Sequence, residues 1–509
     1  MRVPHSSNGG GADMASGLAS DLFRIKTLER LNADAESGEN KLERHLGPWS
    51  LIGLGIGAVI GAGLFSLTGI AAAEHAGPAV TLSFAIAAIG CALAGMCYSE
   101  LAGMIPVAGS AYTYTYATMG EFIAWIIGWD LVLEYAVGAA TVSVSWSRYV
   151  TRFMRDTLGI NLPGSLVHSP FETYQLADGT VAYGLVNVPA ILIVVAASAL
   201  LIIGIRESAR VNGAVVVLKL AVVLTVIGVG LFYIKAQNYD PFLPANTGTF
   251  GEYGWSGVMR AAGVVFFAYV GFDAVSTAAQ EAKNPQRNMM IGILGSLAIC
   301  TVLYIAFAGV LTGLVHYDAM RGDAAPVNTA IAATPFPWLK SLVTFGVICG
   351  FSTVILVLLL GQSRVFYSMS KDRLLPAFFS AIHPKWKTPY RSNLFFMVFT
   401  SALGGFLPIS QLGHMTSIGT LLAFILVCAG VVILRRTQPD APRAYRTPLV
   451  PFVPILGALF CLGMMLSLDG DTWLRLIIWL AIGLVIYFAW SRKHSRVGRE
   501  EGAQVTTAL

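Results

Sequence analysis

The feature that most constrains this chain is a series of long apolar stretches, which recur from Leu51 to Trp490 with short polar breaks between them. An apolar stretch of about 18 or more residues can cross the roughly 30 Å hydrocarbon core of a bilayer as a helix. The sequence has 509 residues, of which 55% are hydrophobic and only 12% are charged. This charged fraction is about half that of ordinary soluble proteins. We therefore predict an all-α integral membrane protein.

About 12 transmembrane helices are predicted, centred near residues 60, 90, 133, 196, 224, 269, 302, 353, 401, 423, 457 and 481. An even number of spans places both termini on one side, and cytoplasmic loops carry an excess of Lys and Arg. With both termini cytoplasmic, the internal segments hold 24 of the 33 Lys and Arg residues and the external loops hold six. The sequence therefore predicts a multi-pass protein of the cytoplasmic (inner) membrane.

The polar ends of the chain are predicted to be tails. Residues 1–48 form a cytoplasmic N-terminal tail, and residues 492–509 form a cytoplasmic C-terminal tail around a transmembrane domain at 49–491. Residues 14–36 are either a short amphipathic helix on the inner membrane surface or a disordered segment. No cleavable signal peptide is expected, because the first 48 residues lack an apolar core.

Composition and side-chain chemistry exclude several classes of function. The basic charge faces anionic lipid and is not interleaved with aromatic residues, so we expect membrane lipid and no nucleic acid as partner. All six cysteines lie in apolar spans without the spacing of a zinc or haem motif. No nucleophile–base pair or metal cluster is evident at membrane depth. We therefore predict no enzyme activity, no disulfide, no metal and no cofactor.

Two predicted spans contain residues that interrupt a helix. Span 1 has five glycines in GLGIGAVIGAGLF (53–65), each costing about 1 kcal/mol relative to alanine, so it could open near Gly61. The alternative is close helix packing through the small residues Gly57 and Gly61. Span 6 places Gly271 and Asp273 at mid-membrane depth. A carboxylate there costs at least about 2.5 kcal/mol and usually faces a cavity or a partner; the alternative is that Asp273 caps a neighbouring helix.

The two interrupted spans are five apart, as expected if spans 1–5 and 6–10 are inverted copies and spans 11 and 12 are appended. The predicted boundaries are about 49–236, 257–436 and 449–491. At paired breaks, freed N–H groups face an anion and freed carbonyl groups face a cation. A zwitterionic amino acid carries both charges, so we expect a transport site of this kind.

Three segments resemble a known family: GIGAVIGAGLF (55–65), YSELAGMIPVAGSAYTYTY (98–116) and FFAYVGFDAVSTAAQEAKNPQRNM (266–289). They are similar to signature regions of the amino acid, polyamine and organocation (APC) transporter superfamily, and most similar to its bacterial cationic amino acid transporter branch. The resemblance implies a LeuT-like 5+5 inverted repeat with broken helices 1 and 6. It also implies secondary active amino acid transport by alternating access around a central site.

Transfer by motif position implies the binding residues. The substrate carboxylate would meet the backbone amides at 61–63, and its ammonium would meet carbonyls of span 6, where Phe267 would also gate from outside. Some relatives carry a hydroxyl residue where this chain has Ala62, so that side-chain hydrogen bond is absent. The predicted substrate-binding residues are Ile60, Gly61, Ala62, Gly63, Phe267, Ala268, Val270 and Asp273.

Charged residues in spans 3 and 5 predict coupling to protons. Asp130 and Glu134 share one face of span 3, and Lys219 lies in span 5. A Glu134–Lys219 structural ion pair is the alternative. In sodium-coupled relatives of the fold a sodium ion lies near spans 1, 5 and 8, and Lys219 resembles a built-in replacement, so we favour protons over sodium. Glu134, Lys219 and Asp273 are the predicted proton-coupling residues, and the sequence does not rank the carboxylates.

The predicted function is proton-coupled uptake of L-amino acids, without the need for a protein partner. Exchange of amino acids and transport of polyamines or organic cations remain alternatives. A channel is disfavoured, because selectivity filters usually repeat by oligomeric symmetry and show rings of like charge. A cationic substrate side chain would need an acidic partner, which Glu134 or Asp130 could supply. The sequence favours neutral side chains slightly and names no substrate.

Overall fold

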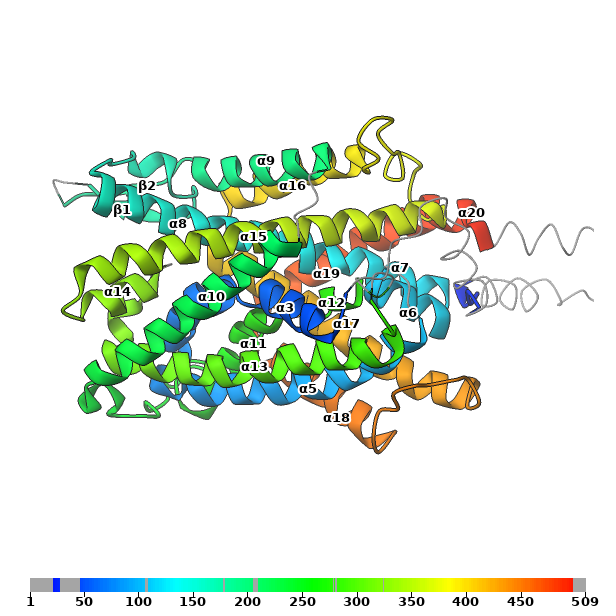
Figure 1. Ribbon diagram of the computed structural model, residues 1–509, viewed down its shortest axis with the longest axis horizontal. Helices are drawn as coiled ribbons and strands as arrows, with labels where there is room; N and C mark the ends of the chain where they lie inside the picture. The colour runs from blue at the N-terminus through cyan, green and yellow to red at the C-terminus, as the bar shows by residue number, and fades with distance from the viewer. Residues whose placement is uncertain are drawn as a thin grey trace, which may run out of the picture.

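The structure is a computed structural model that describes residues 22–27, 46–105, 109–176, 179–204, 209–277, 279, 282–323 and 325–497. Most of the predicted tail helix at 14–36 lies outside these residues. The described chain is a bundle of helices that run mainly along one axis (Figure 1). The predicted all-α fold is thereby confirmed.

The first half of the chain contains α-helices and short 3₁₀ or π segments (η). They are α3 (Pro48–Val59), η1 (Gly63–Leu67), α4 (Thr68–Ala71), η2 (Ala72–Ala76), η3 (Gly77–Ala79), α5 (Val80–Met104), α6 (Ser110–Thr118), α7 (Glu121–Val132), η4 (Leu133–Val137), α8 (Gly138–Leu158), η5 (Gly164–Leu166), α9 (Val188–Ile203), α10 (Ala209–Gly230), η6 (Leu231–Tyr233) and η7 (Ala236–Tyr239). Strands β1 (Thr173–Gln175) and β2 (Val181–Tyr183) form an antiparallel hairpin in which Thr173 is opposite Tyr183.

The second half continues in the same way. Its elements are α11 (Gly254–Val265), η8 (Phe266–Tyr269), α12 (Ala274–Thr277), α13 (Pro285–Leu314), η10 (Tyr317–Met320), α14 (Pro326–Ala332), α15 (Pro337–Lys371), α16 (Tyr390–Phe406), α17 (Ile409–Thr437), α18 (Phe452–Ser467), α19 (Gly470–Ile486), η11 (Tyr487–Ser491) and α20 (Arg492–His494). The predicted span centres fall on these helices, except that residue 60 lies in an interruption between α3 and η1.

Local sequence explains where several helices begin and end. Proline occupies the first turn of α3, α9, α13 and α15, where its missing N–H would have no helical partner. The Asn187 side chain accepts a hydrogen bond from the amide of Ala190 and so caps α9. Gly204 ends α9 in the left-handed conformation that glycine adopts at low cost.

Eight helical segments of the described chain are long and apolar enough to cross a membrane, by length and composition. They are Gly63–Met104, Glu121–Leu158, Gly213–Tyr233, Gly254–Ser276, Pro285–Leu314, Pro337–Lys371, Ile409–Thr437 and Gly470–His494, and the shorter apolar helices are α3, α9 and α18. Together they support a multi-pass membrane protein.

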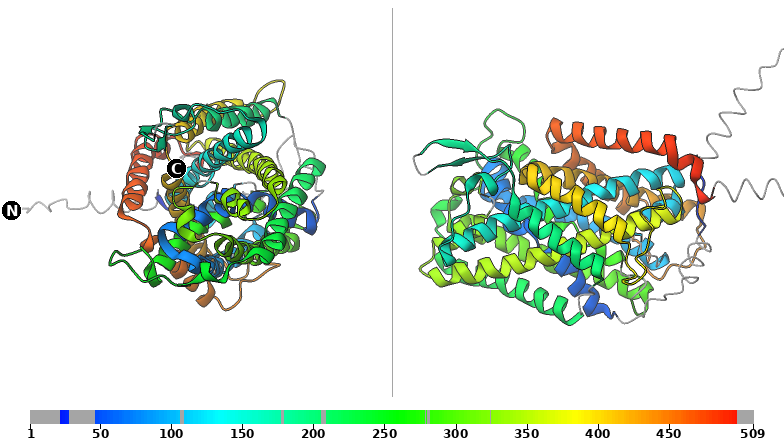
Figure 2. Two further views of the ribbon diagram at one scale, coloured as in Figure 1. Left: turned by 90° about the vertical axis from the view of Figure 1, so that its left-hand side faces the viewer. Right: turned by 90° about the horizontal axis from the view of Figure 1, so that it is seen from above.

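Burial separates an inner set of helices from an outer one. In the span that contains α11, η8 and α12, 89% of the most apolar window is buried, whereas in the span that contains α19 the share is 22%. Figure 2 shows α19 on the outside of the bundle, and its exposed residues include Leu474, Ile477 and Ile478. An apolar outer face suits contact with lipid. The interrupted segment around η8 belongs to the inner, most buried set and lies at the centre of the bundle.

Both ends of the described chain lie at the same end of the bundle (Figure 1). Near the N-terminal end, the Lys26 ammonium forms a buried ion pair with Asp372 at 2.9 Å. Near the C-terminal end, the Arg496 amide donates to the Asp372 carbonyl oxygen. Residues 22–27 and 491–497 therefore meet at the end of α15.

A buried carboxylate, Glu100, anchors the loop after α17. It accepts hydrogen bonds from Arg435 at 2.8 and 2.9 Å, from Arg443 at 3.1 Å and from the Thr447 amide at 2.7 Å. The Glu100 and Arg443 side chains are almost fully buried. Because two cations share one carboxylate, loss of Glu100 leaves buried positive charge without compensation.

We predict that Glu100→Ala lowers stability by about 3 kcal/mol, the lower end of what breaking a buried ion pair costs. The measurement is the thermal unfolding midpoint of the purified protein in detergent. Glu252→Ala, which removes an exposed carboxylate, is the matched control. An unchanged midpoint for Glu100→Ala would show that this network does not stabilise the fold.

Candidate functional site

The first helix of the bundle is interrupted at Ile60. Helix α3 ends at Val59, and Ile60 is extended, with φ −73° and ψ 102°. The chain resumes a helical path into η1, whose amides at Leu64 and Phe65 both donate to the carbonyl of Gly61. The amides of Gly61, Ala62 and Gly63 therefore open a new helix with no preceding turn to receive them. This confirms the predicted break in span 1.

The second interruption follows η8. Val270 is extended with ψ 132°, and Gly271 has φ +109°, a conformation that favours glycine. A Cβ atom at Gly271 would lie 3.1 Å from the carbonyl oxygen of Ala58. The chain becomes helical again in α12 at Ala274. The predicted break in span 6 is present, and it packs against the end of α3.

The two breaks touch each other through backbone. A Cβ atom added at Gly63 would collide with the Cα and amide nitrogen of Ala268. Gly63 thus allows the start of η1 to lie against η8 with no side chain between them. Opposed breaks bring the N–H groups of one helix and the carbonyl groups of the other to a common centre.

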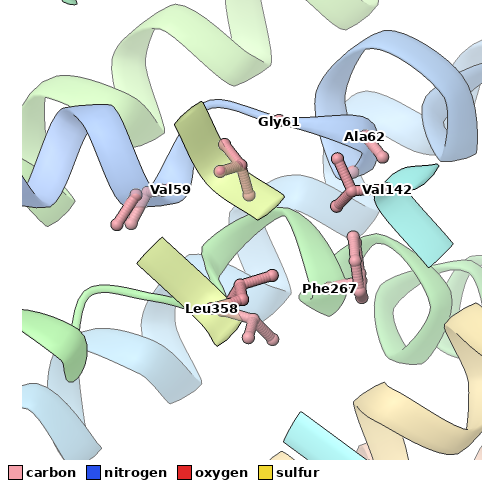
Figure 3. A pocket seen from close by; sticks show the side chains of 10 residues that line it. Val59, Gly61, Ala62, Val142, Phe267 and Leu358 are labelled. Atoms are coloured by element: carbon pink, nitrogen blue, oxygen red, sulfur yellow. The ribbon is translucent and has the colours of Figure 1, made fainter. Parts of the chain in front are cut away.

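A small cavity lies beside this contact. Five of the predicted binding residues line it, namely Gly61, Ala62, Gly63, Phe267 and Val270, together with Ala58, Val59, Val142, Val354 and Leu358. Figure 3 shows Gly61 and Ala62 on one side and Phe267 on the other. The cavity volume of about 10 Å³ suits about one water molecule, so the helices must separate before a larger molecule enters.

The remaining predicted binding residues lie near the cavity without lining it. Ile60 is fully buried at the break, and Ala268 contributes the backbone that touches Gly63. Asp273 belongs to a neighbouring polar cluster.

The carbonyl group of Phe267, which does line the cavity, accepts a hydrogen bond from the Val270 amide. One of the two lone pairs of this carbonyl oxygen is therefore in use.

Lys219 connects α10 to the first break. Its ammonium donates to the carbonyl of Gly57 at 2.5 Å and is buried, and its Cε atom would lie 3.1 Å from a Cβ at Gly350 of α15. Lys219 therefore lies among α3, α10 and α15, the helices of predicted spans 1, 5 and 8. It satisfies one of the carbonyl groups that α3 leaves open at its end.

The polar cluster joins Asp273 to the π segment of the third span. The Tyr135 hydroxyl donates to Asp273 Oδ2 at 2.7 Å, and the Ser110 hydroxyl donates to the same oxygen at 3.3 Å. Glu134 faces Asp273 and Thr420, and its carboxylate oxygens accept no hydrogen bond within the described part of the chain. Asp273 and Glu134 are both fully buried, so two carboxyl groups share one enclosed space.

The alternative of a Glu134–Lys219 ion pair does not hold in this structure, because Lys219 donates to Gly57 and Glu134 faces Asp273. Asp130 precedes the π turn η4, which begins at Leu133 and contains Glu134 and Tyr135. Asp130 instead approaches α17, where its Oδ1 would lie 3.2 Å from a Cβ at Gly419. Among the described residues, the carboxylate of Asp273 accepts hydrogen bonds from the hydroxyl groups of Tyr135 and Ser110 and caps no neighbouring helix.

Several site residues were not predicted. Tyr135 follows Glu134 directly, so a hydroxyl next to a buried acid was the available signal. Tyr304 donates to the carbonyl of Val59 at 2.9 Å and satisfies another open carbonyl of α3. Val142, Val354 and Leu358 stand in uniform apolar runs, where no local pattern separates a cavity wall from ordinary core.

No group of three or more His, Cys, Asp or Glu side chains suited to a metal ion occurs among the described residues. The six cysteines are all free thiols. The site therefore consists of backbone groups at two breaks, an apolar wall, one buried lysine and a pair of buried carboxyl groups.

Comparison with known proteins agrees with this geometry. The family model described as amino acid permease matches residues 46–488. The branched-chain amino acid permease BcaP of Bacillus subtilis (strain 168) is 45% identical over 482 residues, covering 95% of this chain and 100% of the relative. The methylthioribose transporter of the same organism is 42% identical, with 94% and 100% covered.

A plant protein, cationic amino acid transporter 4, vacuolar, of Arabidopsis thaliana, is 36% identical over 422 residues, covering 82% of this chain and 68% of the relative. These relatives are permeases and transporters rather than enzymes, as predicted. The family match spans most of the chain, and the two bacterial relatives match 94–95% of it over their own full length, so this protein belongs to the amino acid permease family of the APC superfamily.

Proposed function

We propose that this protein is a secondary active transporter that takes up L-amino acids together with protons by alternating access. The observation that carries the proposal is the direct contact between two helix breaks, at Gly63 and Ala268, in the most buried part of the bundle. The amides at 61–63 bind the substrate carboxylate, and the carbonyls of Phe267, Ala268 and Val270 bind its ammonium.

The relatives support this proposal. Two of those described are named for amino acid substrates, and one is named for methylthioribose. An amino acid zwitterion matches the two kinds of backbone group at the breaks, whereas methylthioribose has neither a carboxylate nor an ammonium group. The chemistry of the breaks therefore favours an amino acid.

The proposed topology has twelve spans, of which spans 1–5 and 6–10 are inverted repeats. Both termini lie in the cytoplasm, and the protein lies in the cytoplasmic (inner) membrane. This topology takes α3 with η1 and α4 as span 1, and α11 with η8 and α12 as span 6. The meeting of both described chain ends at one end of the bundle supports the even number of spans. Opening on either side separates the breaks from α15 and enlarges the cavity.

Lys219 is the proposed link between protons and the first break. Its ammonium holds the Gly57 carbonyl less than one turn before Ile60, so loss of its proton weakens a charge-assisted hydrogen bond at the end of α3. Its position among α3, α10 and α15 supports the proposal that the protonated lysine takes the place of a sodium ion there. The Glu134–Asp273 pair is the proposed proton acceptor, because two ionised carboxylates in one buried space repel each other.

We predict that Lys219→Ala and Asp273→Asn lose most of the stimulation of uptake by an inward proton gradient. The measurement is uptake of labelled amino acids into proteoliposomes under an inward proton gradient, an inward sodium gradient and no gradient. Lys235→Ala, which removes an exposed lysine, is the control and keeps the stimulation. Full gradient-driven uptake by both site variants would contradict the coupling assignment.

We predict that Gly63→Ala lowers uptake by about tenfold or more, because the added methyl group forces the two breaks apart, and overpacking of this kind costs about 1–3 kcal/mol. Gly53→Ala is the matched control, since a Cβ there meets no atom within 4 Å. Both variants are compared by uptake per molecule of protein inserted. Equal activity of the two variants would show that the contact between the breaks is not required.

A further inference from the structure

We infer that the cavity selects amino acids with short, branched aliphatic side chains, and that Val142, Val354 and Leu358 are the residues that determine this specificity. The inference rests on the proposed function and names the substrate class of the same site. Beyond the two breaks, the wall is built by α8, which carries Val142, and by α15, which carries the other two residues.

The wall offers a substrate side chain only carbon atoms. Every residue that lines the cavity is glycine, alanine, valine, leucine or phenylalanine, so its polar atoms belong to the backbone. The nearby carboxyl groups of Asp273 and Glu134 do not line it, and Asp273 is held by Tyr135 and Ser110. The ammonium of a lysine side chain would enter this space without a counter-ion, at high cost.

Val354 lies where the substrate side chain must start. Its Cγ2 atom is 3.4 Å from the position of a Cβ on Gly61, so it packs directly over the break that is proposed to bind the carboxylate. A bound amino acid places its own Cβ within a few ångströms of its carboxylate, and hence next to Val354. Leu358 is one helical turn further along α15 and shares the same face.

The remaining walls restrict the size and shape of the side chain. Val142 approaches from α8 and Phe267 from the second break, and Figure 3 shows Val142, Phe267 and Leu358 around one space. Valine has a single strongly preferred rotamer in a helix, so Val142 and Val354 cannot swing aside to admit an aromatic ring. Once the helices separate, these walls suit the apolar, branched side chains of valine, leucine and isoleucine.

The same wall disfavours a sugar. The hydroxyl groups of methylthioribose require hydrogen-bond partners when they are buried, and the side chains that line this cavity supply none. The selectivity of this chain is therefore expected to differ from that of its methylthioribose-transporting relative.

The test measures how well a panel of unlabelled compounds competes with labelled leucine for uptake into proteoliposomes. The panel holds valine, isoleucine, phenylalanine, lysine and methylthioribose. Valine and isoleucine are expected to compete within about tenfold of leucine. Lysine and methylthioribose are expected to compete at least about tenfold more weakly, because a charge or hydroxyl groups would be buried without partners. Phenylalanine is expected to compete at least about tenfold more weakly because its ring overpacks the wall. Lysine or phenylalanine competing as well as leucine would overturn the inference.

Substitutions test whether the three wall residues determine the specificity. Val142→Ala, Val354→Ala and Leu358→Ala are each expected to raise the uptake of phenylalanine relative to leucine by about tenfold. Val347→Ala, at a buried position of α15 that does not line the cavity, is the control and keeps the wild-type ratio. Leu358→Val is a smaller change that keeps the apolar wall if an alanine variant does not fold. An unchanged ratio in every wall variant would overturn the residue assignment.

The result also separates this inference from the proposed function. If lysine and phenylalanine were taken up as efficiently as leucine, the protein would still be an amino acid transporter, but its cavity wall would not select among substrate side chains. Absence of uptake for every amino acid, even with leucine preloaded on the other side to permit exchange, would overturn the proposed function itself and the inference with it.

Discussion

The backbones of two interrupted helices touch at the centre of the bundle, where Gly63 lies against Ala268, and the arrangement of the site depends on that contact. A break inside a membrane helix leaves N–H and carbonyl groups without partners, which is costly where water is absent. Bringing two breaks together encloses these groups in one small space lined by protein. The N–H and carbonyl groups that each break leaves unpaired thus become hydrogen-bond donors and acceptors for a polar ligand.

The surrounding side chains stabilise the breaks. Lys219 and Tyr304 donate to carbonyls at the end of α3, and Tyr135 and Ser110 donate to the carboxylate of Asp273 that follows the second break. These groups come from α10, α13, η4 and α6, so the breaks are tied to helices that move relative to one another when a transporter opens. Proton movement at Lys219 or at the Glu134–Asp273 pair would then act on the breaks directly.

The sequence predicted the fold class and the breaks because both have strong local signals. Long apolar runs specify membrane helices, and Gly61, Gly63 and Gly271 mark the places where a helix cannot continue or where backbones approach. The resemblance to sodium-coupled relatives, rather than a local signal, implied that Lys219 lies near spans 1, 5 and 8, and in the structure it lies among α3, α10 and α15. The inverted repeat and the membrane orientation remain predictions.

Contacts between distant segments could not be predicted. The spacing of Glu134 and Lys219 allows an ion pair, but the π turn at η4 aims Glu134 at Asp273, and a π turn has no sequence signature. The residues that form the cavity wall could not be identified from the sequence either, because Val354 and Val347 are the same residue type in the same apolar helix. Only the packing of α15 against the break at Gly61 distinguishes them.

The central claim is that the paired breaks bind both charges of an amino acid, and ligand analogues test it most directly. We would measure the affinity of the purified protein for leucine, for 4-methylpentanoate, which lacks the ammonium, and for 3-methylbutylamine, which lacks the carboxylate. We predict that leucine binds and that each analogue binds at least about 100-fold more weakly, since a hydrogen bond to a charged group contributes about 1.5–3 kcal/mol and each analogue loses more than one. Equal binding of leucine and either analogue would contradict it, because one of the two breaks would then contribute nothing to recognition.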